Sequence, residues 1–377
     1  MYHESRTRGA GPPVLIAAIS GRALAASARS AGYSPMVVDF FGDQDTLALA
    51  HSHVRIEDGL ARGMEEDRLV AAFETLSVGP PPIGVVCGAG FEDRPRLLAS
   101  IARRWRLLGN DCRTVETIKD PLAFATLCRE HDIPHPETRT APPADPAGWL
   151  AKRRGGAGGS HIASAAVPCA QLYFQRETPG VPVSALFLAD GRRAVTLGFS
   201  AQWSSPGPEQ PFRYGGAVRP ASLAPRLAAA LADAVGRLAC AIPVVGLNSA
   251  DFLVEGDEFR LLEINPRPGA TLDIFEPLEG SLFALHVAAC EGEVSTAPPP
   301  LAGACAAATV YVEHDIASCP ALQWPDWTAD RPQPGTAFKT GEPLCTVKAA
   351  GSTAVAARAL VNERLATVLA WTRARMS

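Results

Sequence analysis

Four polar residues in the second half of the chain have the types and spacing of a site for a metal ion and an anionic group. Asp251 lies in the segment VVGLNSADFLV, and Glu263, Asn265 and Arg267 lie in the segment EINPRPG. Because side chains alternate between the faces of a strand, Glu263 and Asn265 point to the same face. Two carboxylates and an amide oxygen are ligands suited to Mg²⁺. The planar guanidinium of Arg267 suits phosphate or carboxylate.

The two segments are predicted to be strands of one β-hairpin, because both are apolar and EGDE at 255–258 can form the turn between them. The hairpin would bring Asp251 next to Glu263 and Asn265 and complete a magnesium site. The alternative is that the two carboxylates are solvated charges at strand ends.

A glycine-rich loop is the second candidate site. A short predicted strand at 149–152 ends in Lys152 and leads into RRGGAGGSH, which has four glycines in five positions. Glycine allows backbone N–H groups to approach phosphate oxygens closely, and Lys152 adds a positive charge beside them. The loop is therefore predicted to be a lid over phosphates, and the alternative is a flexible linker.

Two further segments could contribute to a nucleotide site. Lys119, in TIKDPLAF, is predicted to open a helix, where it could also be merely solvated. Gln175 ends a predicted strand, and the connection that follows contains Arg176 and Glu177. Its backbone groups could hold a base, and the alternative is an ordinary connection between strands.

The first ninety residues are predicted to position part of the site. Apolar strands at 14–19, 34–41 and 84–90 alternate with helices at 23–31 and 65–76, and a fourth unit follows at 101–108. This alternation predicts a parallel sheet, whose ligands gather at the carboxyl ends of the strands. GAGFED at 88–93 lacks the full G-x-G-x-x-G pattern, so a dinucleotide site is disfavoured.

The remaining segments are predicted to support the site or to bind substrate. The Pro/Gly-rich stretch 197–223 is interpreted as a binding loop, too irregular for the core, in which Arg213 and Tyr214 contact the acceptor substrate. The alternative is a surface loop fixed by aromatic packing. Helices are predicted at 225–240, 282–290 and 353–375, and strands at 308–316 and 344–350.

Composition limits the class of protein. The chain has 377 residues, of which 47% are hydrophobic and 20% charged, enough for two or three domains. A net charge of −4 provides no electrostatic surface for nucleic acid or anionic membranes. Nine cysteines without a CxxC pair indicate reduced thiols. With no segment typical of a signal peptide or membrane span, we expect a cytoplasmic protein.

In chain order these features resemble the ATP-grasp superfamily of ligases: a Rossmann-like opening, Lys119, Lys152 with GGAGGS, QRE at 175–177, and Asp251 with EINPRPG. Within it, NPRPG and PIGVVCGAGFED resemble the carboligase-type ATP-grasp proteins associated with archaeal-style one-carbon cofactor pathways, those of methanofuran and tetrahydromethanopterin. The resemblance covers most of residues 14–300.

The resemblance implies an α/β ATP-grasp fold with a Rossmann-like N-terminal domain, a central lid subdomain and a small α+β C-terminal lobe. The expected domains are 1–113, 114–300 with the lid at about 135–185, and 301–377.

The resemblance also implies roles for individual residues. The phosphates of ATP are expected to contact Lys119, Lys152 and the lid residues Gly155, Gly156, Gly158, Gly159 and Ser160. The adenine is expected beside Gln175, Arg176 and Glu177. Magnesium or manganese is expected on Asp251, Glu263 and Asn265, and the predicted catalytic residues are Lys152 and Arg267. A glutamate that many members carry two residues after the hinge glycine is missing, because Val181 and Pro182 follow Gly180.

The implied reaction is ATP-dependent joining of a small-molecule carboxylate to an amine through an acylphosphate, with glutamate or a similar amino acid added to a one-carbon cofactor precursor. Two positioned lysines, an arginine and magnesium suit phosphoryl transfer, which depends mainly on positioning and charge neutralisation. One alternative is a carboxylase-type enzyme that uses bicarbonate. Another is a non-catalytic nucleotide-binding regulator. A homodimer is the common arrangement for such an enzyme.

Overall fold

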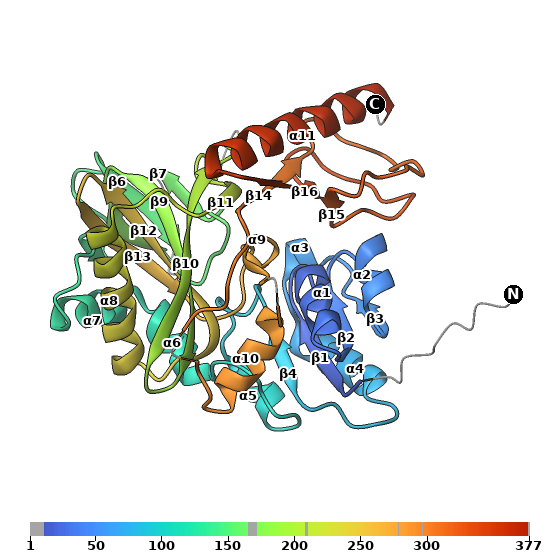
Figure 1. Cartoon of the computed structure of the whole chain (residues 1–377), viewed down its shortest axis with the longest axis horizontal. Helices are drawn as coiled ribbons and strands as arrows, with labels where there is room; N and C mark the ends of the chain where they lie inside the picture. The colour runs from blue at the N-terminus through green and yellow to red at the C-terminus, as the bar shows by residue number, and fades with distance from the viewer. Residues whose placement is uncertain (1–10, 165–171, 208–209, 278, 296, 376–377) are drawn as a thin grey trace, which may run out of the picture.

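Three β-sheets organise the chain in a computed structural model that describes residues 11–164, 172–207, 210–277, 279–295 and 297–375 (Figure 1). In the view of Figure 1 the N-terminal sheet and its helices lie at the lower right and the lid and most of the large sheet at the left, while the edge of the large sheet formed within residues 304–351 extends above the N-terminal helices. Helices α9 (Leu272–Phe275) and α10 (Leu282–Cys290) lie between the two halves. Part of the predicted lid, residues 165–171, and Cys169 within it fall outside the described residues.

The N-terminal sheet is parallel, with strand order β3-β2-β1-β4, which confirms the predicted Rossmann-like opening. Its central strand is buried from Val14 to Ala17, as expected for a strand covered on both faces. The strands are β1 (Pro13–Ala17), β2 (Ser34–Asp39), β3 (Ser52–Arg55) and β4 (Val85–Cys87). The helices are α1 (Arg22–Ser30), α2 (Gln44–Leu49), α3 (Gly59–Arg62), α4 (Glu66–Leu76) and α5 (Arg96–Ala102).

The fourth unit predicted at 101–108 is smaller than expected. It consists of the end of α5 and an isolated parallel bridge between Leu107 and Val85. The sequence pattern also missed α2, β3 and α3, which are short and only partly buried.

The largest sheet has eight antiparallel strands in the order β13-β12-β9-β10-β11-β14-β16-β15. Helix α8 (Pro225–Ala241) covers one face of it, where Leu231, Phe187 and Phe252 are fully buried. The strands are β9 (Val181–Asp190), β10 (Ala194–Ser204), β11 (Tyr214–Arg219), β12 (Val245–Glu255), β13 (Glu258–Asn265), β14 (Ala304–Tyr311), β15 (Thr328–Ala329) and β16 (Pro343–Gly351).

The interpretation of 197–223 as a binding loop outside the core was wrong for most of its length. Strands β10 and β11 occupy much of it and pair in the middle of the large sheet. Their pairing shifts register between Trp203 and Ser204, and the Trp203 ring packs over Gly215 and Gly216 on the facing strand. The glycines make room for an aromatic side chain across two strands, so a composition typical of a loop belongs here to a sheet.

The third sheet is the lid, with antiparallel order β5-β8-β6-β7. Its strands are β5 (Thr138–Arg139), β6 (Trp149–Arg153), β7 (Ile162–Ser164) and β8 (Leu172–Arg176). Two helices precede it, α6 (Cys112–Lys119) and α7 (Pro121–Glu130). Lys119 ends α6 and does not open the next helix. The carboxylate of Asp120 caps α7 instead, and Pro121 takes its first position.

The C-terminal residues continue the large sheet. Strands β14, β16 and β15 form one edge of it, and α11 (Ala354–Arg375) packs across them (Figure 1). The C-terminal lobe therefore shares a sheet with the central part of the chain. The division of the chain into domains at 1–113, 114–300 and 301–377 remains a proposal.

In the described ranges every cysteine is a free thiol. No helix among those residues is long and apolar enough to span a membrane.

His286 joins the N-terminal half to the large sheet from within the core. Its Nδ1 accepts a hydrogen bond from the Leu247 N–H at 2.9 Å, and its Nε2 donates to the Leu108 carbonyl at 2.9 Å. Burial lowers the pKa of His286 to about 4, despite the opposing effect of the bond to Leu108. The neutral ring therefore satisfies two backbone groups from different parts of the chain.

We expect His286→Ala to lower the free energy of unfolding at pH 7 by about 2–4 kcal/mol, because two buried backbone groups lose their partner and a cavity forms. The difference in free energy of unfolding between the natural chain and the variant should shrink as the pH falls from 6.5 towards 4, since the natural chain then loses the stability that its neutral ring provides. Urea unfolding at pH 7 and pH 5 measures both effects. Exposed His51 supplies the control, His51→Ala, and equal losses in the two variants would contradict the assignment.

Candidate functional site

A cavity of about 720 Å³ lies between the three sheets. Its lining includes Ser20 after β1, Lys152 on the lid, Glu263 on the β12–β13 hairpin and Thr346 on β16. A smaller cavity of about 30 Å³ shares Glu263 with the first and adds Lys119 and the lid glycines Gly155 and Gly156. Residues from every part of the chain therefore meet around one cavity.

The hairpin predicted around Asp251 and Glu263 is present, with these two residues opposite each other and Ser249 opposite Asn265. Asn265 Nδ2 donates to Asp251 Oδ2 at 2.8 Å. The other carboxylate oxygen of Asp251, Oδ1, is buried and accepts no hydrogen bond from the described residues. An unpaired buried carboxylate oxygen is costly, so this one is available to a cation.

Lys119 reaches the hairpin from the end of α6. Its Nζ lies 2.9 Å from Glu263 Oε2 and 3.1 Å from Asn265 Oδ1. Burial favours the neutral form of Glu263, but the positive charge of Lys119, with smaller contributions from His161 and Lys152, lowers the pKa of Glu263 to about 2. Burial and the nearby Glu263 charge raise the pKa of Asp251 to about 6. The two carboxylates are therefore unequal, and Glu263 carries the firmer negative charge.

Lys152 points inward from β6, with a side chain that is almost fully buried. Its Nζ donates to Gln175 Oε1 on the neighbouring strand β8 at 2.6 Å. Burial lowers the pKa of Lys152, the nearby Lys119 lowers it further, and Glu263 and Asp251 oppose both effects. Lys152 is thus held by a neutral amide rather than by a carboxylate, which leaves its charge available for an anionic ligand.

The glycine-rich loop lies against the start of β11. The Tyr214 N–H donates to the Gly158 carbonyl at 2.8 Å, and Gly159 lies directly against the Phe212 carbonyl. Gly155 has a φ of +67° and lies against the backbone of Glu92 and Asp93. Glycine is required at such contacts, because a Cβ atom would overlap backbone atoms. Ser160 is exposed, and its hydroxyl donates to the Ala157 carbonyl.

Arg267 connects the hairpin to the N-terminal sheet. Its Nε donates to Glu92 Oε1 at 2.6 Å, and both side chains are largely buried. Burial works against ionisation of Glu92, but the charges of Arg267 and Lys119 and a bond from the Gly90 N–H lower its pKa. Glu92, at the edge of the N-terminal sheet, thus positions Arg267, which lines the large cavity.

The connection after β8 lines the cavity through Gln175, Arg176 and Glu177. The guanidinium of Arg176 lies over the Trp149 ring, 5.4 Å from its centre, and donates to the Ala147 carbonyl. The side chain of Gln175 is already bound to Lys152. Backbone groups and Glu177 are therefore the parts of this segment most available to a ligand.

Arg213 does not line the cavity. Its guanidinium stacks on the Tyr311 ring at 3.7 Å and donates to the carbonyls of Ser205 and Gly341. Tyr214 does line the cavity. The predicted contact of Arg213 with an acceptor is therefore replaced by a packing role that fixes the start of β11.

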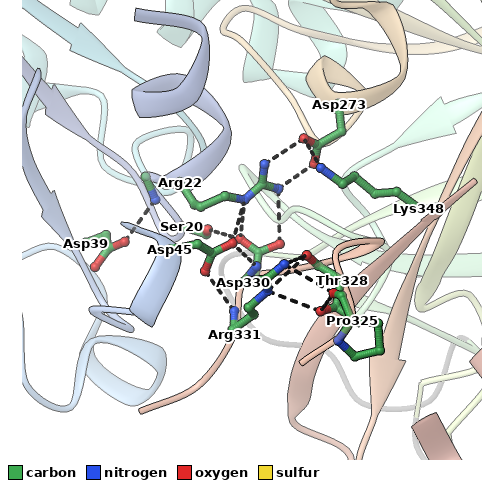
Figure 2. A network of polar contacts seen from close by, with 11 residues as sticks. Ser20, Arg22, Asp39, Asp45, Asp273, Pro325, Thr328, Asp330, Arg331 and Lys348 are labelled. Carbon is green, nitrogen blue, oxygen red and sulfur yellow. Dashed lines mark hydrogen bonds and ion pairs between the residues drawn. The ribbon is translucent and has the colours of Figure 1, made fainter. Parts of the chain in front are cut away.

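Several cavity residues were not singled out as site residues from the sequence. His161 and Tyr173 lie near Glu263 at the lid end of the cavity, and burial lowers the pKa of His161 to about 4 and raises that of Tyr173. At the other end, Figure 2 shows Arg22 between Asp273 and Asp330. The strand pattern predicts that Arg22 and Glu92 lie at the ligand-binding edge of the N-terminal sheet, but it assigns neither a role. Asp273 lies in the four-residue helix α9 and Asp330 follows the two-residue strand β15, and both elements are too short to give a sequence pattern.

The donor set of the hairpin fits a hard divalent cation. It offers carboxylate oxygens from Asp251 and Glu263 and the amide oxygen of Asn265, and Asp251 Oδ1 has no other partner in the described chain. Mg²⁺ usually takes one or two protein carboxylates and completes its shell with water and phosphate oxygens. Among the described residues, no group of three or more His, Cys, Asp or Glu is arranged to hold a metal, so a denser carboxylate or thiolate site is not supported there.

Comparisons with known proteins agree with this geometry. Residues 118–271 match the family described as the ATP-grasp domain. The carbamoyl phosphate synthase large chain of Rubrobacter xylanophilus is 26% identical in an alignment 227 residues long, which covers 53% of this chain and 21% of that protein. This chain therefore spans about a fifth of the length of that curated relative.

Two solved structures resemble nearly the whole chain. The biotin carboxylase domain of Hydrogenobacter thermophilus 2-oxoglutarate carboxylase, with MgADP and bicarbonate, has a TM-score of 0.73 at 11% identity and covers 93% of this chain and 89% of its own. N5-carboxyaminoimidazole synthase of Aspergillus clavatus, with ADP and 5-aminoimidazole ribonucleotide, has a TM-score of 0.69 at 13% identity. The match covers 95% of this chain and 98% of that one.

These likenesses confirm the predicted α/β ATP-grasp fold. The ADP and magnesium in the solved structures are consistent with the predicted cofactors, ATP and Mg²⁺. The matched domain contains Lys119, the glycine-rich loop and the whole β12–β13 hairpin. Residues 118–271 therefore match an ATP-grasp domain, and the chain as a whole has the fold of the two solved structures.

Proposed function

We propose that this protein joins a carboxylate to an amine, using ATP to convert the carboxylate into an acylphosphate. The observation that carries the proposal is the hairpin, on which Asp251, Glu263 and Asn265 lie together next to Lys119. A second lysine, Lys152, reaches the same cavity from the lid with no carboxylate bonded to it. A protein that only bound nucleotide would not need this full set of charges.

Each residue has a role in this scheme. Lys119 and Lys152 bind ATP phosphates, the loop from Gly155 to Ser160 covers them, and the segment from Gln175 to Glu177 contacts the adenine. Asp251, Glu263 and Asn265 hold magnesium, which supplies charge neutralisation for the phosphates. Lys119 is paired with two of these oxygens, so it would exchange them for phosphate when the nucleotide binds. Lys152 and Arg267 stabilise negative charge on the transferred phosphoryl group.

Exclusion of water is the task of the glycine-rich loop. An acylphosphate hydrolyses readily, so the amine must reach it before water does. Hydrogen bonding of Gly158 to Tyr214 and the contact of Gly159 with Phe212 place the loop over the cavity from the β11 side. The lid therefore depends on the strand that the sequence pattern had suggested to be a loop.

Resemblance to known proteins limits the candidates for the carboxylate and the amine. NPRPG and PIGVVCGAGFED resemble carboligase-type proteins of one-carbon cofactor pathways, which favours glutamate or a similar amino acid and a methanofuran- or tetrahydromethanopterin-type precursor. Bicarbonate is the second candidate, because one solved relative in fold contains bicarbonate and is a carboxylase domain. That structure is described as a dimer, which supports a homodimer for this chain.

The test is ADP and phosphate release by the purified protein with Mg²⁺ and ATP. Candidate carboxylates are L-glutamate, aspartate, bicarbonate and pterin or furan acids, each offered with and without candidate amines. We expect release that requires one particular carboxylate and amine together. Release that needs bicarbonate alone would favour the carboxylase alternative, and nucleotide binding without release for any pair would favour a regulatory protein.

We expect Glu263→Gln to reduce ADP release by about 100-fold or more while the fold is retained, because the hairpin loses its firmest negative charge for magnesium. Glu258→Gln is the matched control, since Glu258 lies on the same strand with an exposed side chain. Steady-state ADP release and circular dichroism measure activity and folding. Unchanged release in Glu263→Gln would remove the magnesium assignment.

The two central glycines of the lid provide a second test. Both have positive φ angles, +65° for Gly158 and +71° for Gly159, so alanine strains either backbone by a similar amount, about 1 kcal/mol. A Cβ at Gly159 would overlap the Phe212 carbonyl, whereas a Cβ at Gly158 meets open space. We expect Gly159→Ala to raise the KM for ATP by about tenfold relative to Gly158→Ala, together with faster tryptic cleavage near Arg153 and Arg154. Equal KM values would show that the contact of Gly159 with Phe212 does not hold the lid.

A further inference from the structure

The end of the large cavity opposite the hairpin is built around one arginine. Arg22, at the start of α1, is 4% exposed. Its Nη1 donates to Asp273 Oδ1 at 2.6 Å and its Nη2 donates to Asp273 Oδ2. Its Nε and Nη2 also donate to Asp330 Oδ1 and Oδ2, at 3.1 and 3.2 Å (Figure 2). Two carboxylates thus occupy the guanidinium, which leaves it poorly suited to an anionic ligand.

Negative charge exceeds positive charge around this arginine. Asp45 lies 3.8 Å from Arg22 Nε, and its carboxylate accepts the backbone N–H groups of Asp330 and Arg331. Lys348 Nζ lies 3.9 Å from Asp273 (Figure 2). The guanidinium of Arg331 turns away to the carbonyls of Thr328 and Pro325.

Asp43 faces the same end of the cavity without a partner. Its side chain lines the cavity, and the residue is 5% exposed. Although Asp43 is the N-cap of α2, its carboxyl group makes no capping hydrogen bond and receives none from the other described residues. The oxygens of this carboxyl group open onto the cavity, so they are available to a ligand that enters it.

The protonation of Asp43 follows from its neighbours. Burial raises the pKa of Asp43 to about 9, the charges of Asp330, Asp39 and Asp45 add to the rise, and Arg22 opposes it. From β3, His53 is bonded to Asp39, and Arg55 donates to the Phe40 carbonyl near Glu57. Asp43 therefore carries a proton at neutral pH, and an added positive charge would remove that proton.

We propose that Asp43, with Asp330 nearby, binds a cationic nitrogen group, an alkylammonium or a guanidinium, of one of the substrates that the enzyme joins. The inference rests on the proposed ligase function and names a chemical feature of its substrate. A cation gives Asp43 a partner and offsets the excess of carboxylates. A metal ion is a poorer occupant, because the described residues contain no group of three or more His, Cys, Asp or Glu with suitable geometry.

The proposal predicts that binding of the cation releases a proton. At pH 7.5 the free protein holds Asp43 protonated, and the bound cation favours its charged form, so close to one proton leaves for each ligand bound. Affinity should also rise with pH between 6 and 8, where the alkylammonium itself stays charged. Neutral and anionic analogues should show neither effect.

The experiment is calorimetric titration of the intact protein, saturated with MgADP, in buffers of different ionisation enthalpy at pH 7.5. The probes are two matched pairs, L-glutamate against glutarate and 1,4-diaminobutane against 1,4-butanediol. We expect at least one cationic probe to bind about tenfold or more tightly than its analogue, with proton release. Asp43→Asn should abolish both the preference and the release. Asp67→Asn, an exposed carboxylate on α4, should retain both.

Each result decides the question. Equal affinity within both pairs, or a preference that survives in Asp43→Asn, would overturn the proposal, as would binding to the natural chain without proton release. ADP release that requires a carboxylate and an amine but shows no preference for a cationic group would reject the cation site and keep the ligase function. A preference lost in Asp43→Asn, in a protein that releases no ADP with any pair, would keep the cation site and reject the ligase function.

Discussion

Pairing of buried charges between separate segments is the constraint on which the rest of the structure depends. Lys119 on α6 holds Glu263 on β13, and Arg267 after β13 holds Glu92 beyond β4. The Arg267–Glu92 pair is largely buried, so removal of one member costs about 3–5 kcal/mol, because the other charge is left without compensation. The Glu263 side chain is 32% exposed, so water offsets part of the loss when the Lys119–Glu263 pair is broken. The first pair joins α6 to the large sheet, and the second joins the end of the β12–β13 hairpin to the edge of the N-terminal sheet. The pairs thus help to hold Lys119, Glu263 and Arg267 in the walls of the two cavities.

Strand register determines which side chains face the cavity. Asp251 is paired on one side with Glu263 and on the other with Ser184 of β9. A shift of one residue would turn every side chain of the strand to the opposite face of the sheet. The candidate metal site therefore depends on a strand that has neighbours on both sides, and the lid, which rests on β11, depends on the same sheet.

The parts of the fold and site that the sequence predicted are those that local pattern determines. Alternating strands and helices indicated the parallel sheet, and the apolar segments on either side of EGDE indicated the hairpin with Asp251, Glu263 and Asn265. The contacts that were missed join residues far apart in the chain, 175 positions for Arg267 and Glu92 and 308 for Arg22 and Asp330. No local pattern encodes them. Strands β10 and β11 were missed because packing of Trp203 over Gly215 and Gly216 requires a composition that local rules assign to loops.

The two ends of the cavity differ in charge and in their position along the chain. The cationic residues of the hairpin end, Lys119, Lys152 and Arg267, all lie within the domain matched at 118–271. The carboxylates of the other end come from outside it, from α2, α9 and the segment after β15. In the proposed function, nucleotide chemistry and substrate choice are thus carried by different parts of the chain, joined by one cavity. On that proposal, Lys119, Lys152 and Arg267 at the hairpin end attract an anionic group and the carboxylates at the Asp43 end attract a cationic group, so electrostatics orients a substrate that reaches both.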